Sequence, residues 1–563
     1  HLMVEAEPDM PWKLVVTYDE ARAREIYDDF CCFRDDVWLY PAKDLLFYSA
    51  DIHGNLLTRQ RLLTLRHLME DPSGVVVTTL DGLMDHLFPL EQLRNQILRV
   101  RPGEEVDLEQ WKERLTQLGY ERMPQVDGMG QFSIRGGILD IFPLTEEVPV
   151  RIELWDTEID SIRTFDLESQ RSIEQLDEIL IYPATELVLT REELLQGAQR
   201  LRKEEKTFSE KLRKAMKTEE AHRIQSIIKE LTEGLEEGWK ITGLDSCVTY
   251  FGRETVSFLN YFEPDSSMIF LDEPPRLREK GEAVEAEFRE SMSHRLEKGY
   301  LLPGQTELLY PVKEILARAQ RPNTVYLTGL EQKLPGMTVE KKYSISVKNV
   351  NSYQSSFEML IQDLQRWKKE KYRVILLSGS RTRASRLAGD LREYDLRAFC
   401  PDQETQQVQP GEILVTYGNL HRGFEYPQIK FLVITEGDMF GTEKKKRKRK
   451  KTSYEGKKIQ SFSELSVGDY VVHEDHGLGV YRGIEKIERD KVVKDYLKIE
   501  YADGGNLYLP ATRLDGIQKY AGADAKAPKL NKLGGEQWNR TKTRVKTAVR
   551  EIARDLVKLY AAR

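Results

Sequence analysis

Cysteine is scarce in this sequence, with four residues among 563, at positions 31, 32, 247 and 400. They form no CxxC pair and no Cys/His cluster with the spacing of a zinc site. Cys31 and Cys32 are adjacent and the other two are isolated. The sequence therefore predicts reduced, inert thiols and no structural metal.

Long apolar runs are also missing, since none approaches the roughly 20 residues that span a bilayer. The first residues, HLMVEAEPDMPWKLVV, lack the basic region, apolar stretch and small-residue cleavage site of a signal peptide. We therefore expect no membrane partner and a cytoplasmic location.

No phosphate-binding loop of the form GxxxxGK[ST] occurs anywhere in the chain. The nearest catalytic signal is the apolar run 268–271 followed by Asp272 and Glu273, which looks like a magnesium-holding strand end. Without a phosphate loop, we expect a buried strand that ends in a polar turn at Pro274-Pro275. Residues 432–436 are likewise an apolar run that ends in an acidic residue, and they too lack a phosphate-binding loop. No ATPase site is predicted.

The remaining catalytic patterns are equally weak. His473 and His476 lie beside Gly477 and Gly479, which favours a tight turn between strands over a metal site. No nucleophile elbow is recognisable, and carboxylates are too abundant for any pair to stand out. The sequence predicts no catalytic residue and no metal ligand.

What the chain does have is length and a split charge. Its 563 residues are enough for about three to five domains. Residues 443–563 contain 29 Lys/Arg and 17 Asp/Glu, a balance of +12, so the preceding part carries -20 of the total -8. The basic tail either lies near nucleic acid or is an exposed linker that charge keeps soluble, and the composition does not separate the two.

Two stretches predict parallel α/β layers. Residues 13–16 and 75–78 are short apolar runs, followed by 20–30 and 80–87 as helix candidates. An amphipathic helix is expected over 56–69, with its arginines forming a solvated face. Three further strand candidates begin at Val374, Ile413 and Leu432 and predict a second parallel sheet.

Between these layers, residues 125–183 are rich in short strand candidates and turn residues and predict a small, mostly antiparallel β domain. Residues 191–238 are charged and have helical periodicity. The run KKKRKRKK at 444–451 predicts a flexible linker. Short strands between 470 and 509 predict a compact β barrel, and residues 538–559 an amphipathic helix. That helix stops in mid-pattern and the chain opens almost on a strand, so a fragment is expected.

Arg135, Arg151 and Trp155 all lie in the small β domain. Arginine and tryptophan are typical of interface hot spots, and arginine offers paired hydrogen bonds to carboxylates. Composition alone favours ordinary packing or solvated residues over an interface.

Two stretches carry a family resemblance. SIRGGILDIFPLTEEVPVRIELWDTEIDSIRTFDLESQR, at 133–171, resembles the second domain of the damage-recognition subunit UvrB and of bacterial transcription-repair coupling factors (Mfd). VGDYVVHEDHGLGVYRGIEKIERDKVVKDYLKIEYADGGNLYLP, at 467–510, resembles the CarD-like module that binds the β subunit of RNA polymerase. The two stretches occur on one chain, together with KLNKLGGEQW at 529–538, which resembles the segment that leads into the family's translocase. This combination resembles the N-terminal part of a coupling factor.

The resemblance implies a multidomain α/β and α+β fold: a UvrB-like α/β module with an inserted small β domain, a second α/β domain, an SH3/Tudor-like small β barrel and a C-terminal helix. The expected boundaries are 1–100 (truncated domain 1a), 101–185 (domain 2), 186–340 (helix-rich domain 1b), 341–442 (α/β domain 3), 443–460 (basic linker), 461–523 (polymerase-interaction domain) and 524–563 (helix toward a translocase).

By resemblance, Arg135, Arg151 and Trp155 contact UvrA, although relatives often have another aromatic residue in place of Trp155. Lys486, Ile487 and Glu488, with Tyr508 across the sheet, contact the polymerase β subunit by pairing an exposed strand with a strand of the partner. In the family a C-terminal domain masks the UvrA-binding surface, so this chain is expected to expose it.

The function implied is that of an adaptor in transcription-coupled nucleotide-excision repair, which binds stalled RNA polymerase and recruits UvrA. The intact family protein is implied to be an ATP- and Mg²⁺-dependent translocase on double-stranded DNA, with its motor beyond residue 563; this part needs no cofactor, and a monomer is expected. The rivals are a UvrB-like ATPase or helicase that uses Asp272 and Glu273, and a plain DNA-binding protein working through residues 444–451.

Overall fold

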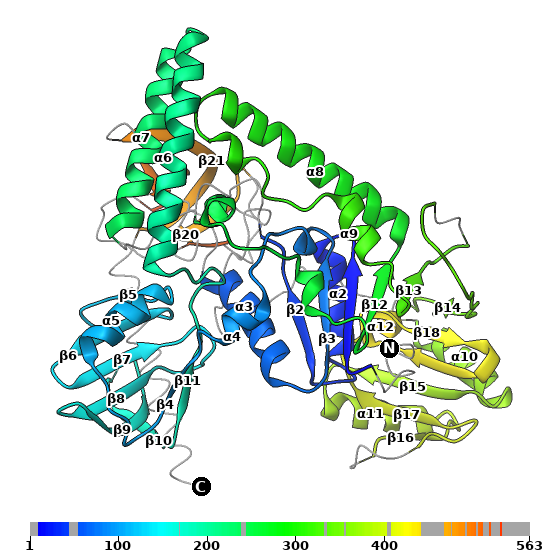
Figure 1. The fold of residues 1–563 in the computed structure, drawn as a ribbon. Coiled ribbons are helices and arrows are strands. Elements are labelled where there is room, and N and C mark those ends of the chain that lie inside the picture. The colour runs from blue at the N-terminus through cyan, green and yellow to red at the C-terminus, as the bar shows by residue number, and fades with distance from the viewer. Residues whose placement is uncertain are drawn as a thin grey trace.

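The computed structural model describes residues 10–43, 55–167, 169–237, 244–331, 335–353, 356–401, 407–440, 467–473, 476–489, 492–502, 505–510, 517–519 and 530–531. These residues form four large sheets, a two-stranded pair and a long helical hairpin (Figure 1). The expected linker at 443–460 and the expected helix at 524–563 lie almost entirely outside them. None of the described helices is long and apolar enough to cross a membrane.

The first sheet is parallel throughout, in the order β13-β12-β1-β3-β2. Its strands are β1 (Trp12–Thr17), β2 (Val37–Tyr40), β3 (Gly74–Thr79), β12 (Ser267–Asp272) and β13 (Thr324–Leu327). Runs of β-branched residues buried on both faces are typical of such a sheet. The parallel α/β layer predicted from the first two strand candidates is confirmed.

Alternate residues of the central strands enter two separate cores. Val15, Val75 and Val77 pack with α2 (Glu20–Phe30) on one face, and Leu14, Val16 and Val76 face the core that includes α3 (Asn55–Glu70) on the other. This period of two is what a strand imposes on its side chains. Further helical elements around this sheet are η2 (Asp81–Leu83), α4 (Leu90–Arg94), η4 (Phe258–Tyr261), α8 (Pro274–Glu297) and α9 (Val312–Arg318).

Two local predictions were wrong here. Residues 80–87 contain only the 3₁₀ turn η2 and two isolated bridges, from Asp85 to Leu309 and from Leu87 to Val256. Pro274-Pro275 begins the 24-residue helix α8 instead of a turn, because proline's fixed φ suits the first helical turn, where the amide has no partner. Glu273 before it takes the left-handed conformation, φ 52°.

The arginines of α3 do not form a solvated face. Arg61 is fully buried, and its guanidinium pairs with Glu186 and Asp85, both buried as well. Glu186 also pairs with Lys43, 3.0 Å away, and Lys43 with Asp245 at 3.1 Å. The partners come from distant parts of the sequence, so the helical pattern alone could not reveal them. This buried charge cluster joins the first sheet to the chain that returns from the small β domain.

The second sheet has the order β10-β9-β8-β7-β6-β5 and is antiparallel except for the β5–β6 pair. Its strands are β5 (Glu121–Arg122), β6 (Gln131–Arg135), β7 (Ile138–Phe142), β8 (Val150–Trp155), β9 (Glu158–Phe165) and β10 (Ser172–Leu176). The predicted antiparallel character is confirmed. The chain enters through β4 (Leu98–Val100) and α5 (Leu108–Gln117) and leaves through β11 (Ile179–Ile181), which pairs with β4.

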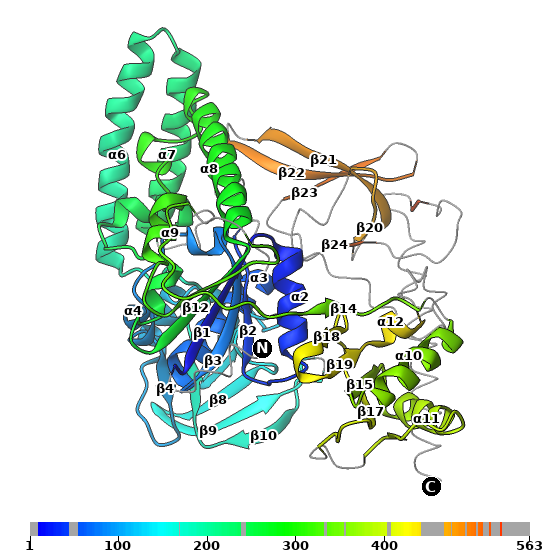
Figure 2. The ribbon, with the colours of Figure 1, turned by 90° about the vertical axis from the view of Figure 1, so that its right-hand side faces the viewer.

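A long antiparallel helical hairpin follows, formed by α6 (Arg191–Lys214) and α7 (Thr218–Glu237). It projects from the body of the molecule (Figures 1 and 2). A capping box of Thr190 and Glu193 starts α6, and the base is packed by η3 (Leu244–Phe251) and η5 (Pro303–Gln305). The predicted helical section is therefore confirmed.

The third sheet has the order β14-β18-β19-β15-β17-β16, with β15 (Arg373–Ser378) parallel to β17 (Ile413–Tyr417) and β19 (Phe431–Ile434). This confirms the three predicted strands of a second parallel sheet. The remaining elements are β14 (Lys348–Asn349), β16 (Ala398–Phe399), β18 (Phe424–Tyr426), α10 (Phe357–Lys369), α11 (Arg381–Arg392), η6 (Pro427–Ile429) and α12 (Glu436–Phe440).

The last sheet, drawn in orange tones in Figure 2, has the order β23-β22-β21-β20-β24. Its strands are β20 (Tyr470–His473), β21 (Gly477–Arg489), β22 (Val492–Glu500), β23 (Asn506–Pro510) and β24 (Ile517–Lys519). Within the described residues the outer strands β23 and β24 do not pair. Closure into an SH3/Tudor-like barrel therefore stays a prediction.

Candidate protein-docking site

The β6–β7 hairpin and strand β8 position the three residues predicted to form an interface. A two-residue turn of Gly136 and Gly137 joins β6 to β7, and Gly136 has φ 60°, which glycine adopts without cost. At the next residue a Cβ would lie 2.9 Å from the Leu154 carbonyl oxygen, so Gly137 lets β8 approach the turn. The turn thus places Arg135 beside the end of β8.

One face of the sheet carries all three predicted residues. Residues of one strand that are two apart share a face, so Arg151 and Trp155 of β8 lie on the same side. Asp140 of β7 pairs with Arg151 of β8 on one side and with Ser133 of β6 on the other. Arg135 lies two residues after Ser133 and therefore shares its face. The other face, with Leu139, Ile141 and Ile152, is buried in the core. On the outward face Ser133 and Asp140 are buried, while Arg135 and Trp155 are exposed and available to a partner.

Asp140 organises this face. Its carboxylate is almost fully buried and accepts hydrogen bonds from Arg151 Nε at 2.7 Å, Arg151 Nη2 at 2.9 Å and Arg135 Nη2 at 3.1 Å. The Asp140 carboxylate raises the pKa of Arg151 above its ordinary value. Arg151 also lies 4.7 Å from the centroid of the Phe165 ring and donates to the Gln170 carbonyl at 3.3 Å. Arg151 is held in place on several sides.

The two remaining residues are exposed. Half of the Arg135 side chain is accessible, and Trp155 is 81% exposed. An indole in water offers a large apolar area to a partner. A hairpin with Asp156 at φ 60° follows Trp155 and returns the chain to β9. The face therefore combines an enclosed arginine, an arginine that is paired with Asp140 but half exposed, and an exposed tryptophan.

Sequence reasoning missed Asp140, the residue that anchors both arginines. The only signal was an acidic residue between apolar neighbours in the run 138–142, at a position where alternation alone predicts a solvent-facing side chain. Its burial follows from the pairing of three strands. Glu153 of β8 accepts a hydrogen bond from Ser161 Oγ at 2.9 Å and adds a further polar residue beside Arg151. It was also not predicted.

The second predicted contact surface lies on the β21–β22 hairpin. Lys486, Ile487 and Glu488 belong to β21 and pair with β22, but their side chains lie outside the described part. β20 pairs only with residues 477–480 of β21, so within the described strands the far half of β21 is paired on one side. Tyr508 of β23 is partly buried, with Lys498 Nζ 5.7 Å from its ring centroid.

The residues named for a possible nucleotide site are engaged in the fold. Asp272 is buried at the end of β12 and accepts from Thr17 Oγ1 and Arg22 Nε, each at 3.2 Å. Glu273 accepts from the Gly329 amide at 2.7 Å. The N-terminus of α2, where a phosphate would bind, is capped by the Asp19 carboxylate. All three carboxylates thus have hydrogen-bond partners within the fold.

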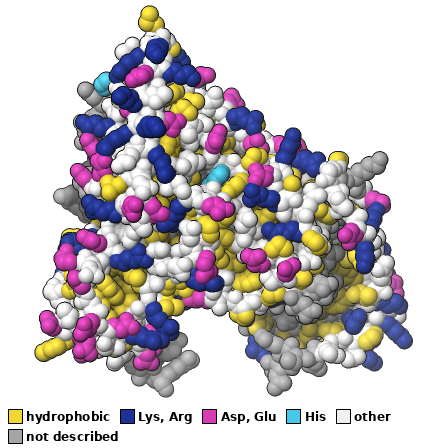
Figure 3. All heavy atoms as spheres, viewed as in Figure 1, with side chains coloured by type: hydrophobic (Ala, Val, Ile, Leu, Met, Phe, Trp, Pro, Cys, Tyr) yellow, Lys and Arg dark blue, Asp and Glu magenta, His cyan; other side chains and the backbone are white. Residues whose placement is uncertain are grey.

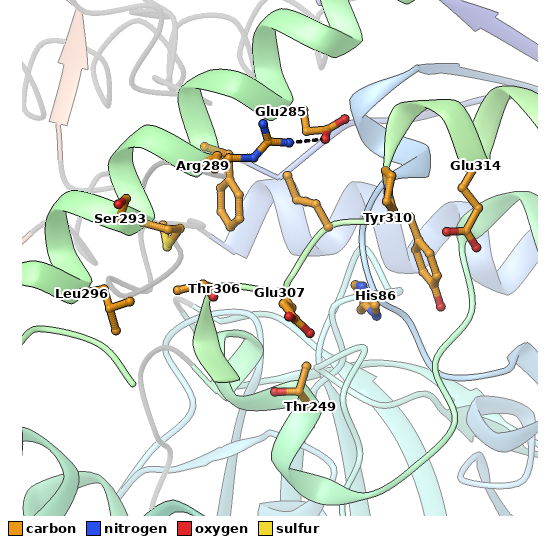
Figure 4. Close-up of a pocket in the computed structure, with 14 residues that line it drawn as sticks. His86, Thr249, Glu285, Arg289, Ser293, Leu296, Thr306, Glu307, Tyr310 and Glu314 are labelled. Carbon is orange, nitrogen blue, oxygen red and sulfur yellow. Dashed lines mark hydrogen bonds and ion pairs between the residues drawn. The ribbon is translucent and has the colours of Figure 1, made fainter. Parts of the chain in front are cut away.

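A cavity of about 710 Å³ lies between α8 and the chain around η5 (Figure 4). His86 stacks on Tyr310 there, with ring centroids 4.1 Å apart, and burial lowers the pKa of His86. Arg289 donates to Glu285 at 2.6 Å. No group of three or more His, Cys, Asp or Glu residues suited to a metal occurs in the described ranges.

Comparison with known proteins gives two domain matches. Residues 98–187 match the UvrB interaction domain, and residues 465–521 match the CarD-like/TRCF RID domain. The first range begins at β4, where the chain enters the small sheet, and ends after β11, where it leaves. The second covers strands β20 to β24.

Whole-chain relatives share one description. The chain is 36% identical over 551 residues to the transcription-repair-coupling factor of Bacillus subtilis, which covers 98% of this chain and 46% of that protein. It is 32% identical to the proteins of the same name in Staphylococcus haemolyticus and Staphylococcus aureus, over 99% and 98% of this chain and 47% and 46% of theirs. The chain is thus similar over nearly its whole length to transcription-repair-coupling factors, and it spans about half the length of these curated relatives.

Proposed function

We propose that this chain is the adaptor part of a transcription-repair coupling factor. It binds a stalled RNA polymerase through the sheet β20 to β24 and recruits UvrA through the outward face of the small sheet. The observation that supports the recruiting role most directly is Trp155, 81% exposed on the face where Asp140 holds two arginines, within the segment that resembles a UvrB interaction domain. The adaptor acts in transcription-coupled nucleotide-excision repair.

The recruiting face has the composition of an interaction hot spot. Trp155 supplies apolar area, and Arg135 supplies a guanidinium with free donors for a carboxylate. Arg151 is largely enclosed by Asp140 and Phe165, so its main role is to hold the Asp140 carboxylate in place. A small part of its side chain remains accessible. The partner surface should therefore be acidic with an apolar pocket for the indole.

The polymerase-binding edge is the far half of β21. A strand with one side unpaired can add a strand of the partner through main-chain hydrogen bonds, and alternate side chains then determine specificity. The partner strand belongs to the β subunit, and Ile487 is the central contact. A monomeric, cytoplasmic protein suits this role, and neither binding step uses a nucleotide, a metal ion or another cofactor.

A two-partner capture experiment tests the proposal. Trp155→Ala should reduce retention of UvrA at least tenfold while capture of the polymerase β subunit is unchanged, as expected for truncating a hot-spot tryptophan. Ile487→Arg should do the reverse. Arg122→Ala, an exposed arginine on the β5 edge of the same sheet, is the matched control and should change neither. Loss of both partners in either variant would contradict two separate surfaces.

A further inference from the structure

The turn between α6 and α7 contains two residues that weaken it. Met216 has φ 62°, a left-handed conformation that glycine normally supplies at a helix C-terminus. The motif is complete, because the Lys217 amide donates to the Leu212 carbonyl at 2.9 Å and the Met216 amide to Arg213 at 3.0 Å. Met216 is also 90% exposed. The turn therefore keeps a strained apolar residue in water.

Lys217 is the second costly choice. It directly precedes α7, and its carbonyl accepts the Ala221 amide at 3.1 Å, which places it at the helix N-terminus. The positive end of the helix dipole disfavours a cation there, and Ser, Thr, Asp or Asn is the usual residue. Lys211 and Lys214, in the last turn of α6, match the dipole of that helix, so only Lys217 needs another explanation.

The turn itself is basic, and the nearest acidic residues on its far side are Glu219 and Glu220 in the first turn of α7. Residues 211–217 read KLRKAMK, four cations and no acidic residue, in a chain with net charge -8. The side chains of Lys211, Lys214 and Lys217 are exposed and have no ion-pair or hydrogen-bond partner in the described part of the chain. Figure 3 shows Lys and Arg side chains gathered around the projecting end of the hairpin.

We propose that this tip binds duplex DNA, with Lys211, Lys214 and Lys217 against phosphates and Met216 against the bases of the minor groove. An exposed apolar side chain flanked by cations is the arrangement of proteins that press a wedge into that groove. Local choices that cost stability are expected where a function requires them. The inference goes beyond the adaptor function and assigns the projecting arm a contact of its own with the template.

Salt-dependent binding of the full chain to a labelled DNA duplex tests the lysines. Because each lost phosphate contact lowers the slope of log K against log salt by about 0.9, the triple change of Lys211, Lys214 and Lys217 to Gln should lower it by roughly 2 to 3. The matched control changes Lys313, Lys341 and Lys369, exposed lysines elsewhere, and should leave the slope unchanged. Both sets are compared again in a chain whose run 444–451 is replaced by Gly and Ser.

Met216→Gly separates the function of the tip from its folding. The change removes the strained conformation, so the melting temperature should rise, while DNA affinity should fall about tenfold through loss of the wedge. Unchanged affinity in this variant, or an unchanged slope in the lysine variant, would overturn the proposal. So would a tip that binds anionic lipid vesicles while both variants bind DNA like the parent.

Discussion

Arg61 and Glu186 are 125 positions apart in the sequence, and their side chains form a two-pronged ion pair inside the protein, Nε to Oε1 at 2.5 Å and Nη2 to Oε2 at 3.0 Å. Arg61 belongs to α3, and Glu186 follows the last strand of the small β domain. Because burying both charges removes them from water, each depends on the other for compensation.

Removing one partner of this pair should therefore be costly. Glu186→Ala leaves the Arg61 guanidinium with Asp85 as its remaining buried carboxylate, and we expect a loss of about 3–5 kcal/mol in the free energy of unfolding. Urea denaturation followed by tryptophan fluorescence measures it. Glu178→Ala removes an exposed carboxylate that pairs with Arg99 and Arg101 and is the control, with a much smaller change expected. Equal losses would contradict the buried pair.

The same pair predicts a loss of stability in acid. Burial raises the pKa of Glu186, but Arg61 and Lys43 outweigh it and bring the pKa down to about 2, from 4.5. A depressed pKa stabilises the folded state above pH 4.5, and this contribution disappears as pH falls toward 2. Urea midpoints across this range should fall in the parent and fall less steeply in Glu186→Gln. Parallel curves for the two proteins would argue against a charged Glu186.

Asp140→Asn tests the anchor of the docking face. The amide keeps the shape of the carboxylate but cannot accept from Arg151 and Arg135 as a charged group, so stability should fall by about 1.5–3 kcal/mol. UvrA retention should fall as well, because the arginines lose their fixed positions. Trp155→Ala, which alters an exposed side chain, should reduce retention without a change in stability. Full retention by Asp140→Asn would assign the carboxylate to folding alone.

Asp272 should behave as a structural residue. Its carboxylate accepts from Thr17 and Arg22, so Asp272→Ala should destabilise the chain by about 1–3 kcal/mol. ATP turnover, measured with and without DNA, should be the same in parent and variant. DNA-stimulated turnover that disappears in Asp272→Ala would instead favour the ATPase interpretation.

Local sequence patterns predicted most of the strands, because a buried strand leaves a recognisable run of apolar residues in the sequence. The apolar runs at 13–16, 75–78 and 374 onward are buried on both faces and became β1, β3 and β15. Glycine and proline punctuation located the small antiparallel sheet. β2 (Val37–Tyr40) was missed, since four residues are too few to show a pattern that distinguishes a strand.

Tertiary relationships were beyond such patterns. The helical pattern of α3 predicts that every arginine faces solvent. The burial of Arg61 depends instead on Glu186 and Asp85, which come from other segments. At the docking face, the residue types suggested Arg135, Arg151 and Trp155, and the family resemblance supplied their role. Asp140 became visible only when strand pairing set it opposite Arg151.

The antiparallel pair β4–β11 joins the two ends of the chain segment that contains the small sheet. The chain enters and leaves this segment side by side at Val100 and Ile179, which are partners in this pair. The small sheet is therefore an insertion whose two chain connections lie at one place, so its length can differ without displacing the strands on either side of it.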